Sequence, residues 1–254
     1  MNIVASIVSH NQADLLATLL HDLDHLVFAH PIQLIVTENS TNASSLAVAK
    51  ASKHFKNGLL QCIHNPKALG FGANHNQAFN HSRLGEGSAL DRFFFVLNPD
   101  LRLEQDIFDK LSDRLAKDST LGIIAPEVFT PEGVLDDTAR YFPSVPRLAK
   151  KLLFNDRGMF PRHDTQLYFP DLIAGMCLGF TARAYKDLGG FDERYFMYYE
   201  DADICRRAKK LNYQPAVDPR VSVVHAAQRD SHKDLGMMLT HISSMIRFLI
   251  TRAN

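Results

Sequence analysis

Three groups of side chains that could do chemistry stand at the ends of apolar runs in this 254-residue chain. Asp100 closes the stretch FFFVLNPD, the adjacent carboxylates Glu200 and Asp201 occur in YYEDADICRR, and His225 ends the run VSVVH. Carboxylates and imidazoles are the side-chain types that hold divalent cations or transfer protons. The question is whether the fold brings these stretches together.

Each group also has an ordinary structural explanation. An Asp after a Pro is a common turn residue or helix N-cap. Acids at positions 200 and 201 favour the start of a helix through its dipole, and Asp203 and Arg207 have the (i, i+4) spacing of an ion pair. A histidine at the end of an apolar run is often a satisfied buried residue. Taken one at a time, these residues leave both explanations open.

The first half of the chain alternates apolar runs with amphipathic segments. Strands are predicted at 2–9, 32–40, 58–65, 92–100 and 122–129, and helices at 12–27, 44–55, 70–82 and 106–118. This alternation predicts an α/β fold with a mostly parallel, Rossmann-like central sheet and helices on both faces. Ligands of such sheets bind outside the carboxyl ends of the strands. The residues predicted at those ends are polar: His10, Asn11, Glu38, Asn39, Asn65, Asn98 and Asp100.

The regular pattern is lost between residues 130 and 171, which are rich in Pro, Arg, Lys and aromatic residues. A long irregular segment in a compact domain is usually functional or mobile. We interpret this one as a partly helical lid or as a plain insertion. Helix and strand patterns resume at 182–192, 198–213 and 220–226. We therefore predict one domain over 1–232, with a variable insertion at 130–171, and an amphipathic helix over 233–254.

The C-terminal segment carries apolar side chains at helical spacing, which leaves two explanations. The helix packs onto the domain or a second subunit, or it contacts an anionic membrane surface through its apolar face. The apolar residues are Met237, Met238, Ile242, Met245, Ile246, Leu249 and Ile250, and the cations that would meet lipid are Lys150, Lys151, Arg247 and Arg252.

Composition narrows the class of protein. Lys and Arg number 28 and Asp and Glu number 28, so no overall field favours nucleic acid. Cys62, Cys177 and Cys205 lack the paired spacing of a zinc or redox site, which is typical of reduced thiols in a cytosolic protein. The N-terminus lacks the pattern of a signal peptide, and no run reaches the roughly 18 apolar residues of a membrane span. We expect a cytoplasmic protein.

Taken together, the motifs resemble those of family 2 glycosyltransferases of the GT-A fold, and within them bacterial rhamnosyltransferases of surface-polysaccharide assembly. The similarity runs from about residue 3 to 232, apart from much of 130–170, and the motifs occur in the family's order. The matching stretches are IVSHNQADLLATLL, IVTENST, NPKALGFGANHNQAF, FVLNPDLRL, AGMCLGFTARAYKDLGGFDERYFMYYEDADICRRAKKLNY and VVHAAQRDS.

The resemblance implies an inverting, metal-dependent sugar transfer from a nucleotide donor. Asp100 and His225 would ligate Mn²⁺ or Mg²⁺, with Asn98 in the place of the metal motif's first acid. Asp201 would be the general base that deprotonates the acceptor hydroxyl. Glu200 would contact the donor sugar or order the start of the helix. The 130–171 segment would lie on the acceptor side.

The resemblance also implies a nucleotide site at the first strands. His10 stands where the family has Tyr, and Glu38 where it has Asp, so the identity of the base stays open. The glycines of LGFG would let the backbone approach the nucleotide, and Gly175 would line the acceptor or sugar pocket. The implied nucleotide-sugar residues are His10, Asn11, Glu38, Asn39, Gly70, Gly72, Asn76, Asn98, Gly175 and Glu200.

The donor implied by this subgroup is dTDP-L-rhamnose, with UDP-linked and other sugar donors as alternatives. The acceptor would be a lipid-linked or growing bacterial cell-surface glycan, which agrees with a peripheral position at the inner face of the cytoplasmic membrane. Two other functions remain open: an inactive sugar-nucleotide-binding module, supported by Asn98, His10 and Glu38, and a nucleotidyltransferase. The latter would give no reason for YYEDADICRR and VVH.

Overall fold

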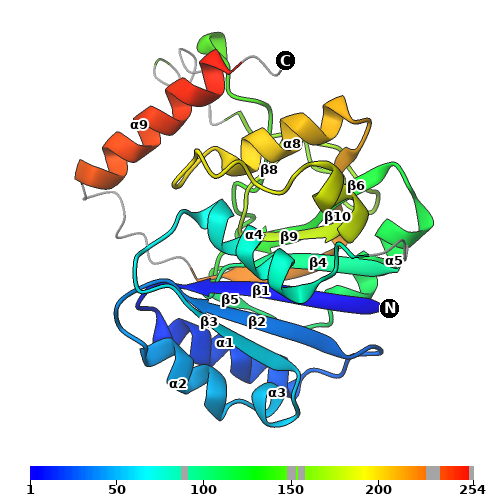
Figure 1. The fold of residues 1–254 in the computed structure, drawn as a ribbon. Helices are drawn as coiled ribbons and strands as arrows, with labels where there is room; N and C mark the ends of the chain where they lie inside the picture. Colours follow the sequence, from blue (N-terminus) through cyan, green and yellow to red (C-terminus); the bar gives the residue numbers. More distant parts are fainter. Residues whose placement is uncertain (87–90, 148–152, 154–157, 227–234, 252–254) are drawn as a thin grey trace.

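The fold was analysed on a computed structural model, which describes residues 1–86, 91–147, 153, 158–226 and 235–251. The first half alternates strands and helices as predicted (Figure 1). Its elements are β1 (Asn2–Ser9), α1 (Ala13–His25), β2 (Ile32–Glu38), α2 (Ser44–Ala51), α3 (Lys53–Lys56), β3 (Leu60–His64), α4 (Phe71–Ser82) and β4 (Arg92–Leu97).

One predicted helix is divided in two. Ser52 has an extended backbone between α2 and α3, and its hydroxyl accepts a hydrogen bond from the backbone amide of Phe55. A serine that caps a following turn in this way competes with continuation of the preceding helix. The predicted helix at 44–55 is therefore two short helices.

The second half is less regular than the first. Its elements are β5 (Leu101–Arg102), α5 (Phe108–Lys117), β6 (Leu121–Phe129), β7 (Ala139–Arg140), β8 (Leu172–Ile173), β9 (Cys177–Thr181), α7 (Ala182–Asp187), α8 (Glu200–Lys210), β10 (Gln214–His225) and α9 (Leu235–Ile250). Within the 130–171 segment, residues 145–147 and 153 are helical. The pattern 220–226 proved to be only the second half of β10, which begins at Gln214 and passes Pro215 and Pro219.

The main sheet has the strand order β3-β2-β1-β4-β9-β6-β10-β5. Strands β3, β2, β1 and β4 are parallel to one another, and β10 is parallel to β6. Strand β9 runs antiparallel to both β4 and β6, so β6 and β10 have the same direction as β1. The expected α/β fold with a mostly parallel sheet is confirmed, and β9 and β5 are its antiparallel members.

Helices cover both faces of this sheet, as the nearly continuous burial of its central strands requires. Ile3, Phe93 and Phe95 belong to a core shared with α1 and α5, whereas Val4 and Phe94 belong to a second core shared with α4, α7 and α8. Figure 1 shows α1 and α2 on one side of the sheet and α4 and α8 on the other. Successive side chains of a strand point to opposite faces, and each face here is apolar.

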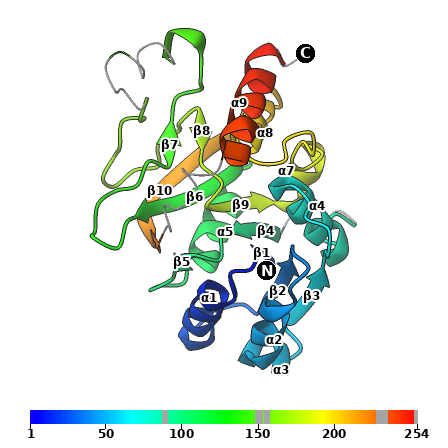
Figure 2. The same cartoon turned by 90° about the vertical axis from the view of Figure 1, so that its left-hand side faces the viewer.

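Because β1, β2, β4 and β10 share one direction, their carboxyl ends meet at one edge of the sheet. The strand ends there are Ser9, Glu38, Leu97 and His225. The ends of the 130–171 segment return to the same region, because β7 pairs with β8 in a separate two-stranded sheet. Figure 2 shows this small sheet beside β6 and β10, on the far side of the molecule from α1–α3.

Candidate active site

Asp100 and His225 face each other at this edge. Strand β5 pairs with the end of β10, and Leu101 lies opposite His225 in that pairing. This register brings Oδ2 of Asp100 to 3.2 Å from Nε2 of His225. Both side chains are largely buried, at 14% and 12% exposure. Two residues 125 positions apart in the sequence thus form one polar pair.

One oxygen of the pair lacks a partner. Oδ1 of Asp100 is buried and has no hydrogen-bond partner, which is costly unless a ligand supplies one. Cis ligands of an octahedral ion with bonds of about 2.1 Å lie about 3 Å apart, close to the separation of this pair. One carboxylate and one imidazole therefore fit Mn²⁺ or Mg²⁺. Among the described residues, no group of three or more His, Cys, Asp and Glu side chains is arranged around such an ion.

His225 has a second carboxylate partner that the sequence did not reveal. Nδ1 of His225 lies 3.1 Å from Oδ2 of Asp136, on the opposite side of the ring from Asp100. Burial alone lowers the pKa of His225, but the hydrogen bonds and charges of Asp100 and Asp136 outweigh it, so that the pKa is raised. Asp136 lies in the irregular segment before β7, where no pattern distinguishes it from the neighbouring acid Asp137.

Asp201 lies in the first turn of α8 and is held by backbone amides. One carboxylate oxygen accepts a hydrogen bond from the amide of Ala202 at 2.7 Å, and the other accepts one from the amide of Gly175 at 3.2 Å. Burial raises the pKa of Asp201 above its usual range, although these amides and the charge of Arg140 lower it. A carboxylate with a raised pKa and fixed orientation is suited to accept a proton.

Glu200, the neighbour of Asp201, is 6% exposed, and its Oε2 atom has no hydrogen-bond partner. Burial, and then the charge of Asp201, raises the pKa of Glu200 to about 8. Glu200 is therefore protonated near neutral pH, and its environment differs from that of Asp201, which two backbone amides hold. Unequal environments of this kind separate the roles of paired carboxylates in enzymes.

The turn that leads into α8 has an unusual backbone. Tyr198 and Tyr199 both have left-handed conformations, with φ of 69° and 68°. Consecutive non-glycine residues in this region cost free energy and persist only where surrounding contacts hold them. Here the rings of both tyrosines contact His241 of α9, and Ser244 donates a hydrogen bond to the carbonyl of Met197. The C-terminal helix thus supports the turn that carries Glu200 and Asp201.

The predicted base-binding residues gather at the ends of β1 and β2. Nδ1 of His10 lies 2.6 Å from the carbonyl of Asn39, and His10 and Asn11 are exposed. Glu38 is fully buried, and its carboxylate accepts hydrogen bonds from Ser40 and from the amides of Asn11 and Ser45. These contacts make Glu38 a support for the strand ends.

Asn39 joins this group to the start of α4. Its side chain exchanges two hydrogen bonds with the backbone of Leu69. Gly70 follows directly, and a β-carbon there would lie 2.7 Å from the carbonyl of Phe196. At Gly72 the nearest atom would be Cβ of Phe191, at 2.5 Å. Both glycines therefore allow close packing of α4 against residues 191–196.

Asn76 also lies against that segment. Its side-chain amide donates to the carbonyl of Phe191 and to Glu193, and its oxygen accepts from Tyr185 and the amide of Phe191. All four hydrogen-bonding positions of the amide are used within the protein. These contacts make Asn76 a support of the loop before α8.

Asn98 and Gly175 lie where two parts of the site meet. The backbone amide of Asn98 donates to the carbonyl of Met176, next to Gly175, and the amide of Gly175 in turn donates to Asp201.

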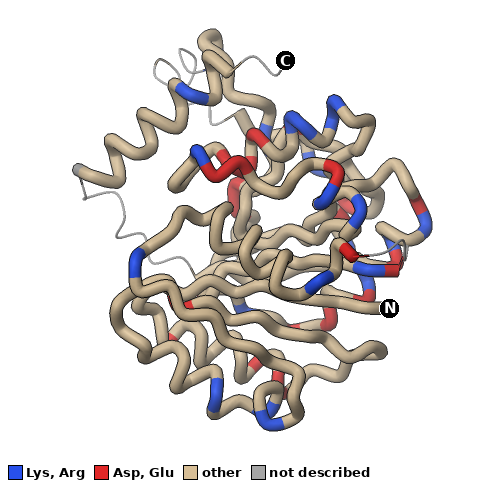
Figure 3. The backbone as a smooth tube through the Cα atoms, in the orientation of Figure 1, with Lys and Arg blue, Asp and Glu red and all other residues tan. Residues whose placement is uncertain are grey.

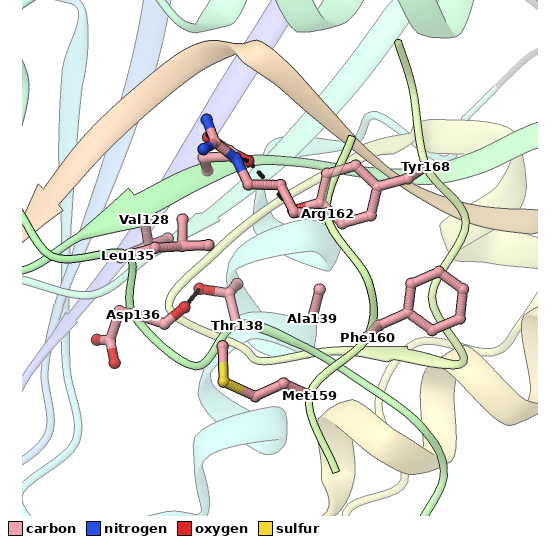
Figure 4. Close-up of a pocket in the computed structure, with 10 residues that line it drawn as sticks. Val128, Leu135, Asp136, Thr138, Ala139, Met159, Phe160, Arg162 and Tyr168 are labelled. Carbon is pink, nitrogen blue, oxygen red and sulfur yellow. Dashed lines mark hydrogen bonds and ion pairs between the residues drawn. The ribbon is translucent and has the colours of Figure 1, made fainter. Parts of the chain in front are cut away.

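A small hollow lies beside Asp136 and is lined in part by Glu127, Arg162 and Tyr168 (Figure 4). Arg162 forms a two-point ion pair with Glu127, so its charge is already matched.

A mixed sheet with this order, and polar residues gathered at the carboxyl ends of its strands, defines a GT-A domain. The model of the family described as Glycosyl transferase family 2 matches residues 5–180. The chain therefore belongs to glycosyltransferase family 2, and is a glycosyltransferase.

The relatives of this chain include rhamnosyltransferases. The N-acetylglucosaminyl-diphospho-decaprenol L-rhamnosyltransferase of Mycobacterium tuberculosis is 27% identical over 246 residues, which cover 89% of this chain and 77% of that protein. Rhamnosyltransferase WbbL of Escherichia coli K12 is 25% identical over 253 residues, which cover 96% of this chain and 90% of that protein. The family resemblance expected from the motifs is confirmed.

Solved structures share the fold at 14% identity. GalNAc-T7, crystallised with UDP, GalNAc and Mn²⁺, superposes with a TM-score of 0.68 over 90% of this chain and 44% of that one. The mannosyltransferase PcManGT of Pyrobaculum calidifontis, in complex with GDP-Man and Mn²⁺, gives 0.64 over 97% of this chain and 63% of that one. This chain thus spans less than two thirds of either structure.

Proposed function

We propose that this protein is an inverting, metal-dependent glycosyltransferase that moves L-rhamnose from dTDP-L-rhamnose to a lipid-linked or growing bacterial cell-surface glycan. The observation that carries the proposal is the Asp100 and His225 pair, with its unpartnered buried oxygen, at the ligand-binding edge of the sheet. The names of the relatives support the sugar, and the diphosphate in the name of the mycobacterial relative supports a lipid-linked acceptor.

Asp100 and His225 would hold Mn²⁺ or Mg²⁺ beside the donor. The ion would supply positive charge to the diphosphate as it leaves. His10, Asn11, Glu38 and Asn39 would bound the nucleotide, either directly or by holding the strand ends in place. Gly70, Gly72 and Asn76 would act through the packing of α4, and Asn98 and Gly175 would lie between the metal and the base.

Asp201 would remove the proton of the acceptor hydroxyl as that oxygen attacks the anomeric carbon from the face opposite the diphosphate. This single displacement inverts the configuration. A double displacement would need a second carboxylate as nucleophile. Glu200 is a poor candidate for that role, because its pKa of about 8 keeps it protonated near neutral pH. Its neutral carboxyl group is suited to a hydrogen bond with the donor sugar.

Thermal unfolding with a panel of nucleotides tests the donor site. A ligand that binds only the folded state raises Tm by mass action. We expect dTDP or UDP to raise the Tm of the wild type only when Mn²⁺ or Mg²⁺ is present, and expect Asp100→Ala to lose this shift. Asp164→Ala, at a residue that is 85% exposed, is the matched control. If no nucleotide shifts the wild type, the proposed donor site is wrong.

Transfer assays would then separate the sugars. Purified protein is offered dTDP-L-rhamnose and UDP-hexoses with a lipid-linked diphosphate acceptor, and the anomeric configuration of the product is read by NMR. A retained configuration contradicts the single displacement. If the protein prefers a UDP-hexose, the proposed mechanism stands and the proposed donor, dTDP-L-rhamnose, is wrong.

We also infer that α9 contacts the membrane surface that carries such an acceptor. Met238, Leu239, Ile242, Ile246 and Ile250 are exposed along one side of the helix. Arg247 is its one Lys or Arg, and the rest of its described length is uncharged in Figure 3. Lys150, Lys151 and Arg252 lie outside the described residues. Among the helices of the described residues, none is long and apolar enough to cross a bilayer.

Flotation with anionic vesicles tests this contact. We expect the wild type to float with the vesicles and Ile246→Glu to remain unbound, because a buried charge opposes insertion of the apolar face. Ser119→Glu, at an exposed position away from α9, controls for added negative charge. Equal flotation of the wild type and Ile246→Glu would remove α9 from the membrane contact.

A further inference from the structure

We propose that Asp136 is a positioning residue for His225: it holds the imidazole so that Nε2 faces Asp100 and the divalent cation. The proposal rests on the proposed function in one respect, namely that a cation binds between Asp100 and His225. The other observations behind it are the contacts of the imidazole with Asp100 and Asp136 and the hydrogen bonds that fix Asp136.

The two ring nitrogens of His225 have different partners. Oδ2 of Asp136 lies 3.1 Å from Nδ1, and Oδ2 of Asp100 lies 3.2 Å from Nε2. A neutral imidazole has one N–H group and one lone pair. When Asp136 accepts the N–H of Nδ1, the lone pair of Nε2 faces a carboxylate oxygen. Two electron-rich atoms at that distance repel each other unless a positive charge lies between them, and either a proton on Nε2 or a metal ion provides that charge.

Asp136 is fixed by its own backbone and by its other oxygen. Its amide donates to the carbonyl of Val128, and its carbonyl accepts from the amide of Thr138. Oδ1 accepts from the amide of Asp137 at 2.8 Å, which leaves Oδ2 for His225. Figure 4 shows the carboxylate of Asp136 directed away from the hollow that its main chain borders. The orientation of the side chain is therefore fixed, with Oδ2 directed at the imidazole of His225.

The segment that contains Asp136 is also connected by hydrogen bonds to Asp201, the proposed base. The carbonyl of Thr138 accepts a hydrogen bond from the amide of Ala174, and the next residue, Gly175, donates to Asp201. Asp136 thus stands at one end of a short hydrogen-bonded path that links His225 to the residue before Gly175. Asp136 belongs to the segment that leads into β7. The first part of the 130–171 insertion therefore contacts His225, a member of the proposed metal-binding pair.

Metal affinity measures the positioning role directly. Free Mn²⁺ is titrated against the full-length protein and followed by electron paramagnetic resonance, for the wild type, Asp136→Ala, Asp136→Asn and the control Asp164→Ala. Loss of a carboxylate that orients a metal-binding histidine typically costs 10- to 100-fold in affinity. We expect a loss of about this size for Asp136→Ala and a smaller one for Asp136→Asn, whose amide oxygen can still accept from Nδ1.

A double variant separates positioning from direct ligation. His225→Ala removes the ligand, so adding Asp136→Ala should cause little further loss if Asp136 acts only through the ring. Asp136→Ala with wild-type Mn²⁺ affinity, beside a His225→Ala variant that has lost it, would overturn the proposal and leave the proposed function intact. Circular dichroism and Tm confirm that each variant is folded.

The tautomer of His225 gives a readout that needs no metal. Ring ¹⁵N chemical shifts of the metal-free protein, recorded at a pH where the imidazole is neutral, should place the proton on Nδ1 in the wild type. Asp136→Ala should move it toward Nε2. An unchanged tautomer in Asp136→Ala overturns the proposal, and a wild type that binds neither Mn²⁺ nor Mg²⁺ instead overturns the metal dependence of the proposed function.

Discussion

The carboxylate of Asp201 accepts a hydrogen bond from the backbone amide of Gly175, with 3.2 Å between the two atoms. Gly175 lies in the turn between β8 and β9, whereas Asp201 lies in the first turn of α8. The contact therefore joins the sheet to the helix that carries the proposed base, and aims a carboxylate at the carboxyl edge of the sheet.

Asp201→Asn should abolish most transfer while preserving the fold. The amide oxygen of Asn can still accept from Gly175, but it cannot take a proton. Loss of a general base typically lowers the rate by 10²- to 10⁴-fold, and we expect kcat to fall in that range. The measurement is steady-state transfer, with nucleotide binding followed by the shift in Tm. Activity that survives in Asp201→Asn would exclude Asp201 as the base.

The pH profile of the wild type should show an acid limb. Burial raises the pKa of Asp201, so the carboxylate protonates and stops accepting protons at a pH above the usual range of an Asp. We expect kcat to fall with decreasing pH through that raised pKa. An acid limb within the ordinary Asp range, near 4, would contradict the buried environment.

Glu200 should make the protein less stable as pH rises. Its pKa is about 8 in the folded state, against 4.5 for an ordinary exposed Glu, so the folded state binds more protons between these two values. Stability contributed by this group is then present at low pH and lost as pH rises toward about 8. The wild type should therefore lose several degrees of Tm between pH 5 and pH 9 because of this residue.

Glu200→Gln isolates that effect. The amide has no charge at either pH, so the variant should lose less Tm than the wild type over the same interval. The exposed Glu104→Gln is the matched control and should follow the wild type. An identical decrease in Tm for Glu200→Gln and the wild type would show that Glu200 is not buried as a neutral acid.

Replacement by alanine should lower the stability of the fold at Gly72 and leave it nearly unchanged at Gly175. A β-carbon at Gly72 would lie 2.5 Å from Cβ of Phe191, whereas at Gly175 the nearest atom is a ring carbon of Phe71 at an ordinary 3.4 Å. Overpacking costs about 1 to 3 kcal/mol, which exceeds the gain of about 1 kcal/mol from replacing a helical glycine. Urea unfolding should show clear destabilisation for Gly72→Ala and little for Gly175→Ala.

Phe248 should matter for both stability and transfer. It is 3% exposed, the guanidinium of Arg206 stacks 4.0 Å from its ring centre, and its ring contacts Tyr199. Replacing a buried Phe by Ala typically costs about 3 to 5 kcal/mol. We expect Phe248→Ala to unfold at lower urea and to lower kcat, because it loosens the turn before Asp201. Val27→Ala, at a residue that is 90% exposed and lies away from α9, should change neither.

The first half of the fold could be predicted because each element there carries its own signal. The apolar run of β1 and the leucine stripe of α1 are local patterns, and both elements occur close to their predicted bounds. Strand β9 was missed because Cys177–Thr181 is short and bounded by no turn signal that sets it apart. The beginning of β10 was missed because Pro215 and Pro219 are unfavourable inside strands.

The residues of the site were likewise predictable only where they belong to elements with a local sequence pattern. Asp100, Asp201 and His225 stand at the ends of predictable elements, so sequence reasoning could select them. Asp136 could not be found, because its partner is 89 residues away and the segment around it has no periodic pattern. The supporting roles of Asn76 and Glu38 were equally hidden, since their partners include distant backbone groups that only the folded chain brings together.

The pairing of Ala139 with Ile173 holds the two ends of the irregular segment side by side. Between these ends the stretch is also tied to the main sheet, because Tyr168 pairs with Val217 and Arg162 forms an ion pair with Glu127. Its composition can therefore change without moving the residues outside it only where these contacts are kept. Asp136 precedes this stretch and Gly175 follows it. Chimeras that exchange residues 141–171 between relatives but keep Arg162 and Tyr168 would test whether this segment sets acceptor preference.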